Sequence, residues 1–120
     1  MINIKIGEQK SYTYTIQLKE TGLPINLVNS KILFQVKKDE YDTDNFLIEK
    51  NITETSEQFV DGKIIDAQNG KFTIFFKAED SLNLEAGQEY FYTIWRIYGN
   101  TKEVISASGS KVEKFIVNPA

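Results

Sequence analysis

The segment Gln88–Tyr98 (QEYFYTIWRIY) constrains the fold of this chain more than any other stretch. It is the longest apolar-rich segment and carries the only tryptophan, and Gly99-Asn100 separates it from a second β-prone run, Thr101–Ser108. Two such runs joined by two residues, with glycine first, predict a β-hairpin closed by a type II′ turn. We therefore expect the rest of the chain to be organised around this hairpin.

The two-residue turn also predicts which hairpin residues face each other. The expected pairs are Tyr98 with Thr101, Arg96 with Glu103, Trp95 with Val104, Ile94 with Ile105 and Tyr92 with Ala107. Directly paired side chains share one face of a sheet. One face then carries Tyr90, Tyr92, Ile94, Ile105 and Ala107, and the second carries Phe91, Thr93, Trp95, Ile97, Val104 and Ser106. Both faces are largely apolar, so each is expected to be covered.

The composition excludes several classes of function. The chain contains neither histidine nor cysteine, which removes Ser-His-Asp and Cys-His nucleophile systems, the usual zinc sites and a disulfide framework. A net charge of −3 with scattered basic residues gives no general reason to bind nucleic acid or an anionic membrane. No apolar run approaches the roughly 18 residues of a membrane span, and the start of the chain lacks the hydrophobic region of a signal peptide. We expect a protein made in a cytoplasm that is not an enzyme and has no cofactor.

Short alternating segments recur through the rest of the chain, and Ser11–Leu18 alternates most clearly, with its tyrosines on one face. The other predicted strands are Ile2–Ile6, Lys31–Lys38, Phe46–Lys50 with Ile52, Lys63–Ile65, Lys71–Lys77 and Glu113–Val117. Turn signals separate these strands about every 8–12 residues, and no long amphipathic helix is present. The sequence therefore predicts a single all-β domain over residues 1–120, an antiparallel sandwich of seven to nine strands.

The turns and strands also match a known template. It comprises the turn Gly22-Leu23-Pro24, the strand segment Asp66–Lys77 (DAQNGKFTIFFK), the stretch Ala86–Tyr92 and a closing Lys114–Val117. With these segments the chain resembles the immunoglobulin-like β-sandwich module of tailed-phage structural proteins, the family of the N-terminal domain of the baseplate upper protein. An extra residue between Gly87 and Tyr90 and the long Asp39–Asp61 region depart from the template.

The resemblance implies an immunoglobulin-like fold and a virion component without an active site. Such a protein is assembled into particles in the cytoplasm of the bacterial host. Its expected partners are copies of itself, other tail or baseplate proteins, or both. The leading hypothesis is therefore a non-enzymatic structural protein of a phage tail or baseplate that acts by protein–protein assembly.

The second hairpin face has two interpretations. Large exposed apolar patches mark interaction sites and aromatic residues are enriched in interface cores, which nominates Phe75, Phe91, Trp95 and Ile97 as an assembly interface. The alternative is that this face forms the sandwich core and the two sides are reversed. The resemblance, which places the Tyr90, Tyr92 and Ile94 face inward, favours the interface.

Other candidate sites are weaker. The acidic loop with Asp39, Glu40, Asp42 and Asp44 invites a calcium site. It lacks the glycine and closing glutamate of an EF-hand, so solvated acids and no metal are predicted. The carboxylate pairs Glu79/Asp80 and Glu54/Glu57 are read as surface charge. The alternative function is a carbohydrate-binding sandwich, in which Trp95 or the tyrosines stack on sugar rings beside loop carboxylates.

Overall fold

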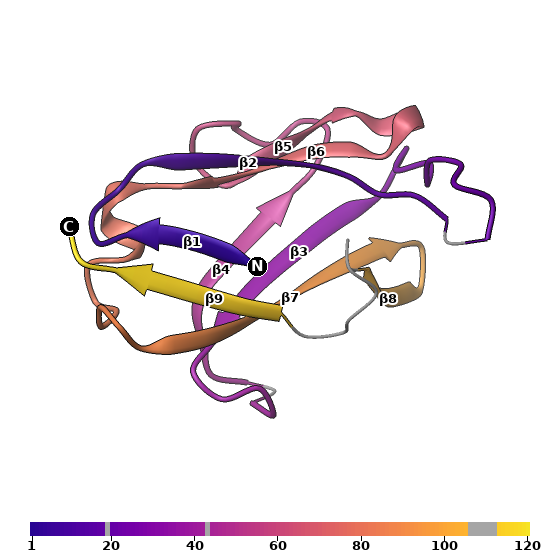
Figure 1. Ribbon diagram of the computed structural model, residues 1–120. Coiled ribbons are helices and arrows are strands. Elements are labelled where there is room, and N and C mark those ends of the chain that lie inside the picture. The colour runs from indigo at the N-terminus through magenta and orange to yellow at the C-terminus, as the bar shows by residue number, and fades with distance from the viewer. Residues whose placement is uncertain (19, 43, 106–112) are drawn as a thin grey trace.

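The computed structural model describes residues 1–18, 20–42, 44–105 and 113–120, and its strands form two facing sheets (Figure 1). The first sheet has six strands in the order β1-β9-β7-β3-β4, with β8 also paired to β7, and the second has three in the order β2-β6-β5. The strands are β1 (Ile2–Lys5), β2 (Lys10–Thr15), β3 (Lys31–Lys37), β4 (Phe46–Ile52), β5 (Gly62–Asp66), β6 (Lys71–Phe76), β7 (Glu89–Tyr98), β8 (Thr101–Ile105) and β9 (Glu113–Asn118).

The strand order is that of an immunoglobulin-like sandwich. Immunoglobulin domains carry strands A, B, E and D in one sheet and C, F and G in the other. Here β2-β6-β5 take the places of B, E and D, and β9-β7-β3 take those of G, F and C. The place of strand A differs, because β1 lies in the other sheet and pairs in parallel with β9. All the other strand pairs within the described ranges are antiparallel, so the predicted fold class is confirmed.

The central hairpin has the predicted register. β7 and β8 pair Tyr98 with Thr101, Arg96 with Glu103, Trp95 with Val104 and Ile94 with Ile105. Gly99 has a φ of 54°, as the first position of a type II′ turn requires. The predicted hairpin positions Ser106, Ala107 and Ser108 lie outside the described residues.

The remaining predicted strands are present, with ends that shift by a few residues. β2 ends at Thr15 rather than Leu18, because the chain turns back and the Leu18 amide donates to the Leu23 carbonyl at 2.8 Å. Two 3₁₀ turns join the strands: η1 (Ala67–Asn69) precedes β6, and η2 (Ala78–Asp80) follows it. No helix of the described segments is long and apolar enough to cross a membrane.

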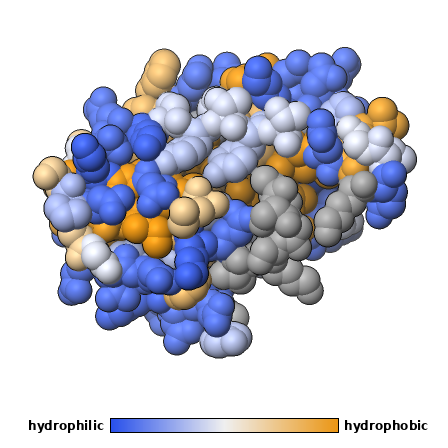
Figure 2. Space-filling view, in the orientation of Figure 1, coloured by the Kyte–Doolittle hydropathy of each residue, from blue (hydrophilic) through white to orange (hydrophobic). Residues whose placement is uncertain are grey.

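The core lies between the two sheets, where Figure 2 shows apolar residues framed by hydrophilic ones. Phe34 of β3 is its centre. The centre of its ring lies 5.3–6.5 Å from the ring centres of Phe76 in the second sheet and of Tyr92 and Phe115 in the first. Tyr90, Tyr92 and Ile94 of β7 are all buried in this core. The hairpin face that the resemblance placed inward is therefore the inner face, and the reversed interpretation is wrong.

Two tyrosines, Tyr92 and Tyr14, extend through the core and have their hydroxyls at its edge. The Tyr92 hydroxyl donates to the Glu113 carboxylate, which also lies 3.6 Å from the N-terminal ammonium of Met1. Burial and the hydrogen bond to Glu113 raise the pKa of Tyr92 well above its ordinary value of 10.0. Burial likewise raises the pKa of Tyr14. Both side chains are therefore held neutral well into the alkaline range.

This arrangement predicts a loss of stability at high pH. A tyrosine whose pKa is raised on folding contributes stability that is fully present below its unfolded pKa of about 10 and is lost as pH rises further. We expect the Tm to fall between about pH 9 and pH 11.5. Tyr92→Phe removes one of the two groups, so its Tm should fall less over the same range. Equal falls for both proteins, measured by circular dichroism, would contradict this assignment.

Candidate interaction surfaces

An apolar patch occupies the outward face of the six-stranded sheet. Phe91, Trp95 and Ile97 alternate along β7 with the core residues and point away from the second sheet, and all three are half-buried. The register places Leu33 of β3 on one side of Trp95 and Val104 of β8 on the other. We call these five residues the outer patch: Leu33, Phe91, Trp95, Ile97 and Val104.

Polar side chains divide and frame the outer patch. Gln35 and Thr93 pair across β3 and β7 between the positions of Phe91 and Trp95, and both are buried although they face outward. Gln35 donates to the Glu49 carboxylate at 2.9 Å. The Lys37 ammonium donates to the Asp42 carbonyl at 3.1 Å, which draws the acidic loop towards the patch. The patch therefore consists of an aromatic centre at Trp95 and a separate contact at Phe91.

Trp95 lies on the outward face of the sheet, and its indole N–H has no acceptor among the described residues. Its Nε1 is buried and has no hydrogen-bond partner among the described residues. The Lys102 ammonium lies 4.5 Å from the centre of the ring, a cation–π contact that covers part of the indole. A buried donor without an acceptor costs about 1–3 kcal/mol. Only the half-buried ring of Trp95, and not its Nε1, is therefore open to a partner.

The fourth predicted interface residue, Phe75, lies elsewhere. It belongs to β6 and points outward from the three-stranded sheet, whereas Phe91, Trp95 and Ile97 point outward from the other sheet. The structure does not bring all four residues onto one surface. Phe75 instead packs against Phe59, whose side chain is 69% exposed, with ring centres 5.7 Å apart and planes at 87°.

These two phenylalanines line a shallow groove of about 500 Å³. Its other lining residues are polar or charged: Gln9, Lys10, Ser11, Lys77 and Glu79. Sequence analysis missed Phe59 because it lies in the poorly patterned stretch Thr53–Asp61. An isolated aromatic residue in a polar segment was the available signal.

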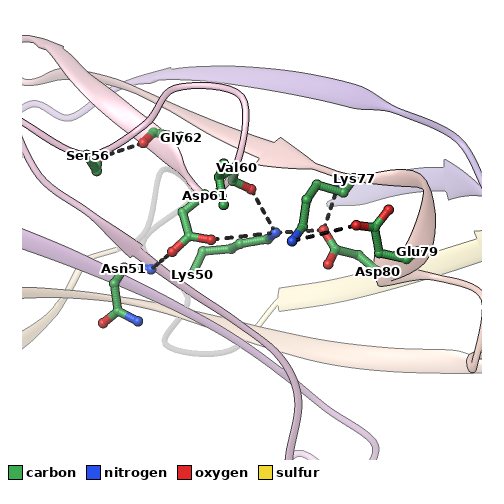
Figure 3. A network of polar contacts seen from close by, with 9 residues as sticks. All are labelled: Lys50, Asn51, Ser56, Val60, Asp61, Gly62, Lys77, Glu79 and Asp80. Atoms are coloured by element: carbon green, nitrogen blue, oxygen red, sulfur yellow. Dashed lines mark hydrogen bonds and ion pairs between the residues drawn. The ribbon is translucent and has the colours of Figure 1, made fainter.

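A buried lysine anchors the largest polar network of the described residues (Figure 3). Lys50 of β4 is 2% exposed, and its ammonium lies 2.6 Å from the Asp80 carboxylate and 3.8 Å from that of Asp61. It also donates to the Val60 carbonyl at 3.1 Å. Asp80 in turn accepts from the Lys77 amide at 2.7 Å. Lys50 therefore fastens η2 and the β4–β5 connection to the first sheet.

The network corrects one reading of the sequence. Asp80, read as surface charge together with Glu79, is the principal partner of a buried cation. The sequence contains a signal for this burial. Lys50 lies two residues from each of the core residues Ile48 and Ile52, so it faces inward as they do. The network borders the groove, since the Lys77 amide bonds to Asp80 and the Lys77 side chain lines the groove. Its centre, Lys50, is buried and does not line the groove, so we assign Lys50 to stability.

The acidic loop forms a turn rather than a ligand cluster. The Asp39 carboxylate accepts from the Tyr41 amide at 3.0 Å, and the Asp39 carbonyl accepts from the Asp42 amide at 3.0 Å. The described part of the chain contains no group of three or more histidine, cysteine or acidic residues arranged to hold a metal ion.

The chain was compared with known protein families, protein sequences and solved structures. No protein-family model matches the chain, and no curated protein sequence matches it. Among solved structures it is similar to the N-terminal domain of phage TP901-1 ORF48, with 16% identity and a TM-score of 0.48. The similarity covers 98% of this chain and 84% of that chain.

The Lys50 network yields a prediction about stability. Lys50→Ala should lower the free energy of unfolding by about 3 kcal/mol. It leaves the carboxylates of Asp80 and Asp61, of which Asp80 is the more buried, in a low-dielectric setting without their cation. The matched control is Lys114→Ala, since Lys114 and Glu89 form an exposed pair at 3.3 Å. That control should change stability by less than about 0.5 kcal/mol. Urea denaturation measures both, and similar losses would show that the network contributes no more than surface pairs.

Proposed function

We propose that the protein is a non-enzymatic structural component of a phage tail or baseplate, and that it acts by assembling with other proteins through the outer patch. Its location is then the virion, with assembly in the bacterial host cytoplasm. The partners are further copies of the chain, other tail or baseplate proteins, or both. The template segments of the sequence and the immunoglobulin-like strand order support this proposal together.

Trp95 is the observation that carries the proposal. The core is complete without it, since Tyr90, Tyr92 and Ile94 fill the inner face of β7. Trp95 instead stands on the outward face between Leu33 and Val104, with a donor that lacks an acceptor among the described residues. Tryptophan in such a setting is a frequent anchor of protein interfaces.

A substitution at Trp95 tests the assembly function. Trp95→Lys should leave folding intact and weaken assembly by about 30-fold or more in Kd, the equivalent of about 2 kcal/mol. Light scattering behind a size-exclusion column, over a range of protein concentrations, measures the assembly mass. Phe59→Lys, which changes an exposed aromatic residue on the other sheet, is the matched control and should assemble normally.

Two results would contradict this function. An unfolded Trp95→Lys protein would place Trp95 among the core residues, and a folded variant that assembles like the wild type would remove the outer patch from the contact. If the wild-type protein is a monomer at every concentration, candidate tail proteins are added and the fluorescence of Trp95 is measured. Unchanged fluorescence with all of them would also reject the proposal.

The groove beside Phe59 favours a second candidate function, the binding of a neutral oligosaccharide. An exposed aromatic face attracts the polarised C–H groups of a sugar ring, and Lys77 and Glu79 on the rim offer a donor and an acceptor to its hydroxyls. Trp95 is a poorer platform for stacking, because Lys102 covers part of its ring.

The second function predicts a specific loss. Phe59→Ala should abolish binding on a glycan array while leaving the assembly mass unchanged, whereas Trp95→Lys should retain binding. Glycan binding that survives Phe59→Ala would place the sugar elsewhere, and the absence of any glycan signal for the wild type would reject this function.

A further inference from the structure

One edge of the second sheet is open. β2 pairs only with β6, in a register that joins Thr15 to Lys71. The next residue, Ile16, donates its amide to the Gly70 carbonyl at 3.0 Å. Hydrogen-bonded and non-hydrogen-bonded pairs alternate in an antiparallel ladder. The even-numbered residues of β2 therefore direct their backbone groups at β6, and the odd-numbered residues direct theirs away from the sheet.

The outward groups belong to Ser11, Thr13 and Thr15. No backbone or side-chain group of the described residues bonds to their amides or carbonyls. Three donors and three acceptors thus line the edge at a regular spacing. An exposed row of this kind is a template for pairing with another strand.

Three other strand edges, those of β1, β5 and β4, carry specific contacts. On β1, the Asn3 amide and carbonyl both bond to the Tyr12 hydroxyl. On β5, the Ile64 amide donates to the Thr53 carbonyl at 2.9 Å. On β4, the Asn51 amide donates to the Asp61 carboxylate at 3.0 Å. The β2 edge is open because β1, which corresponds to strand A, lies in the other sheet, so the place of strand A beside β2 is vacant.

The edge also lacks the usual protection. Natural edge strands are guarded by charged residues, proline or bulges, whereas the segment Ser11–Leu18 contains neither charge nor proline. Ser11, Thr13 and Thr15 are exposed, and β2 pairs with β6 without a register shift. Figure 2 shows a pale strip over β2, neither strongly hydrophilic nor apolar, with bluer residues around it. The ammonium of Lys10, at the start of the strand, is engaged by the Asn3 carbonyl at 3.1 Å.

We propose that β2 of one copy pairs antiparallel with β2 of a second copy, which joins two three-stranded sheets into one sheet of six strands. A two-fold axis through the edge places odd-numbered residues opposite odd-numbered residues, so the outward donors meet outward acceptors in every pair. The uncharged edge brings no like charges together, and hydroxyl side chains pair across the new ladder. This contact rests on the proposed assembly function and adds a second surface to it.

We place the two-fold axis within residues 13–15, where three registers keep the odd residues opposite one another. An axis at Thr13 pairs Thr13 with itself, an axis at Tyr14 pairs Thr13 with Thr15, and an axis at Thr15 pairs Thr15 with itself. Paired residues of this type have Cα atoms about 5.5 Å apart, within the range that a disulfide spans. A register wrong by two residues separates the same atoms by about 9 Å, beyond that range.

The absence of cysteine from the chain allows a clean cross-linking experiment. Thr13→Cys alone, Thr15→Cys alone and an equal mixture of the two are oxidised under mild conditions and separated by non-reducing electrophoresis. Thr55→Cys, at an exposed threonine in a loop remote from the edge, is the matched control for random collision. One of the three samples should cross-link about tenfold faster than the control or more, because pairing raises the local thiol concentration from micromolar to millimolar.

The pattern of cross-links decides the proposal and reports the register. Rapid cross-linking of Thr13→Cys alone supports an axis at Thr13, and that of Thr15→Cys alone supports an axis at Thr15. Rapid cross-linking only in the mixture supports an axis at Tyr14. Rates equal to the Thr55→Cys control in all three samples would overturn it. Repeating the set with Trp95→Lys separates the two surfaces: cross-linking that persists when the outer-patch contact is lost belongs to the β2 edge.

A proline variant supplies a second readout. The Thr13 amide points away from β6, so Thr13→Pro removes a donor from the edge without breaking the β2–β6 ladder. In the Trp95→Lys background, Thr13→Pro should convert dimers to monomers while far-UV circular dichroism stays unchanged. A folded Thr13→Pro protein that retains the dimer mass would contradict pairing through this edge.

Discussion

The pairing of β7 on both of its edges is the constraint on which the rest of the structure depends. β3 lies along one edge, and β9 and then β8 lie along the other, so hydrogen bonds fix the rotation of the whole strand. A slip of one residue would turn Tyr92 out of the core and Trp95 into it. One register therefore determines both which residues of β7 enter the core and which form the outer patch.

With β7 fixed between its neighbours, other contacts close the ends of the sandwich. Lys50 lies at a core position of β4 and reaches Asp80 and Asp61, so the connections around β5 and η2 are held against the first sheet. Burying this cation is tolerable because carboxylates and a backbone carbonyl surround it. The same segment covers the edges of β4 and β5, whereas no comparable segment of the described chain reaches β2.

The fold was predictable because its signals are local. The alternation of Tyr90, Tyr92 and Ile94 and the turn at Gly99 determine the hairpin register without reference to distant residues. Which strands share a sheet is decided by long-range pairing, and this is why Phe75 was grouped with Phe91 although the two face outward from different sheets. Local alternation indicates that Lys50 faces inward, but it does not identify Asp80 and Asp61 as its partners. The Phe59–Phe75 contact likewise joins residues that no local pattern relates.

The outer patch and the β2 edge differ in the kind of contact each supports. The patch lies on a sheet face and buries side chains, whereas the edge offers backbone groups at the side of the other sheet. Use of one surface therefore leaves the other free. A two-fold edge contact closes on itself and makes pairs, while a face contact between unlike surfaces builds a ring if its rotation closes and a helical filament if it does not. A chain with one contact of each kind can thus build a ring of pairs from a single small sandwich.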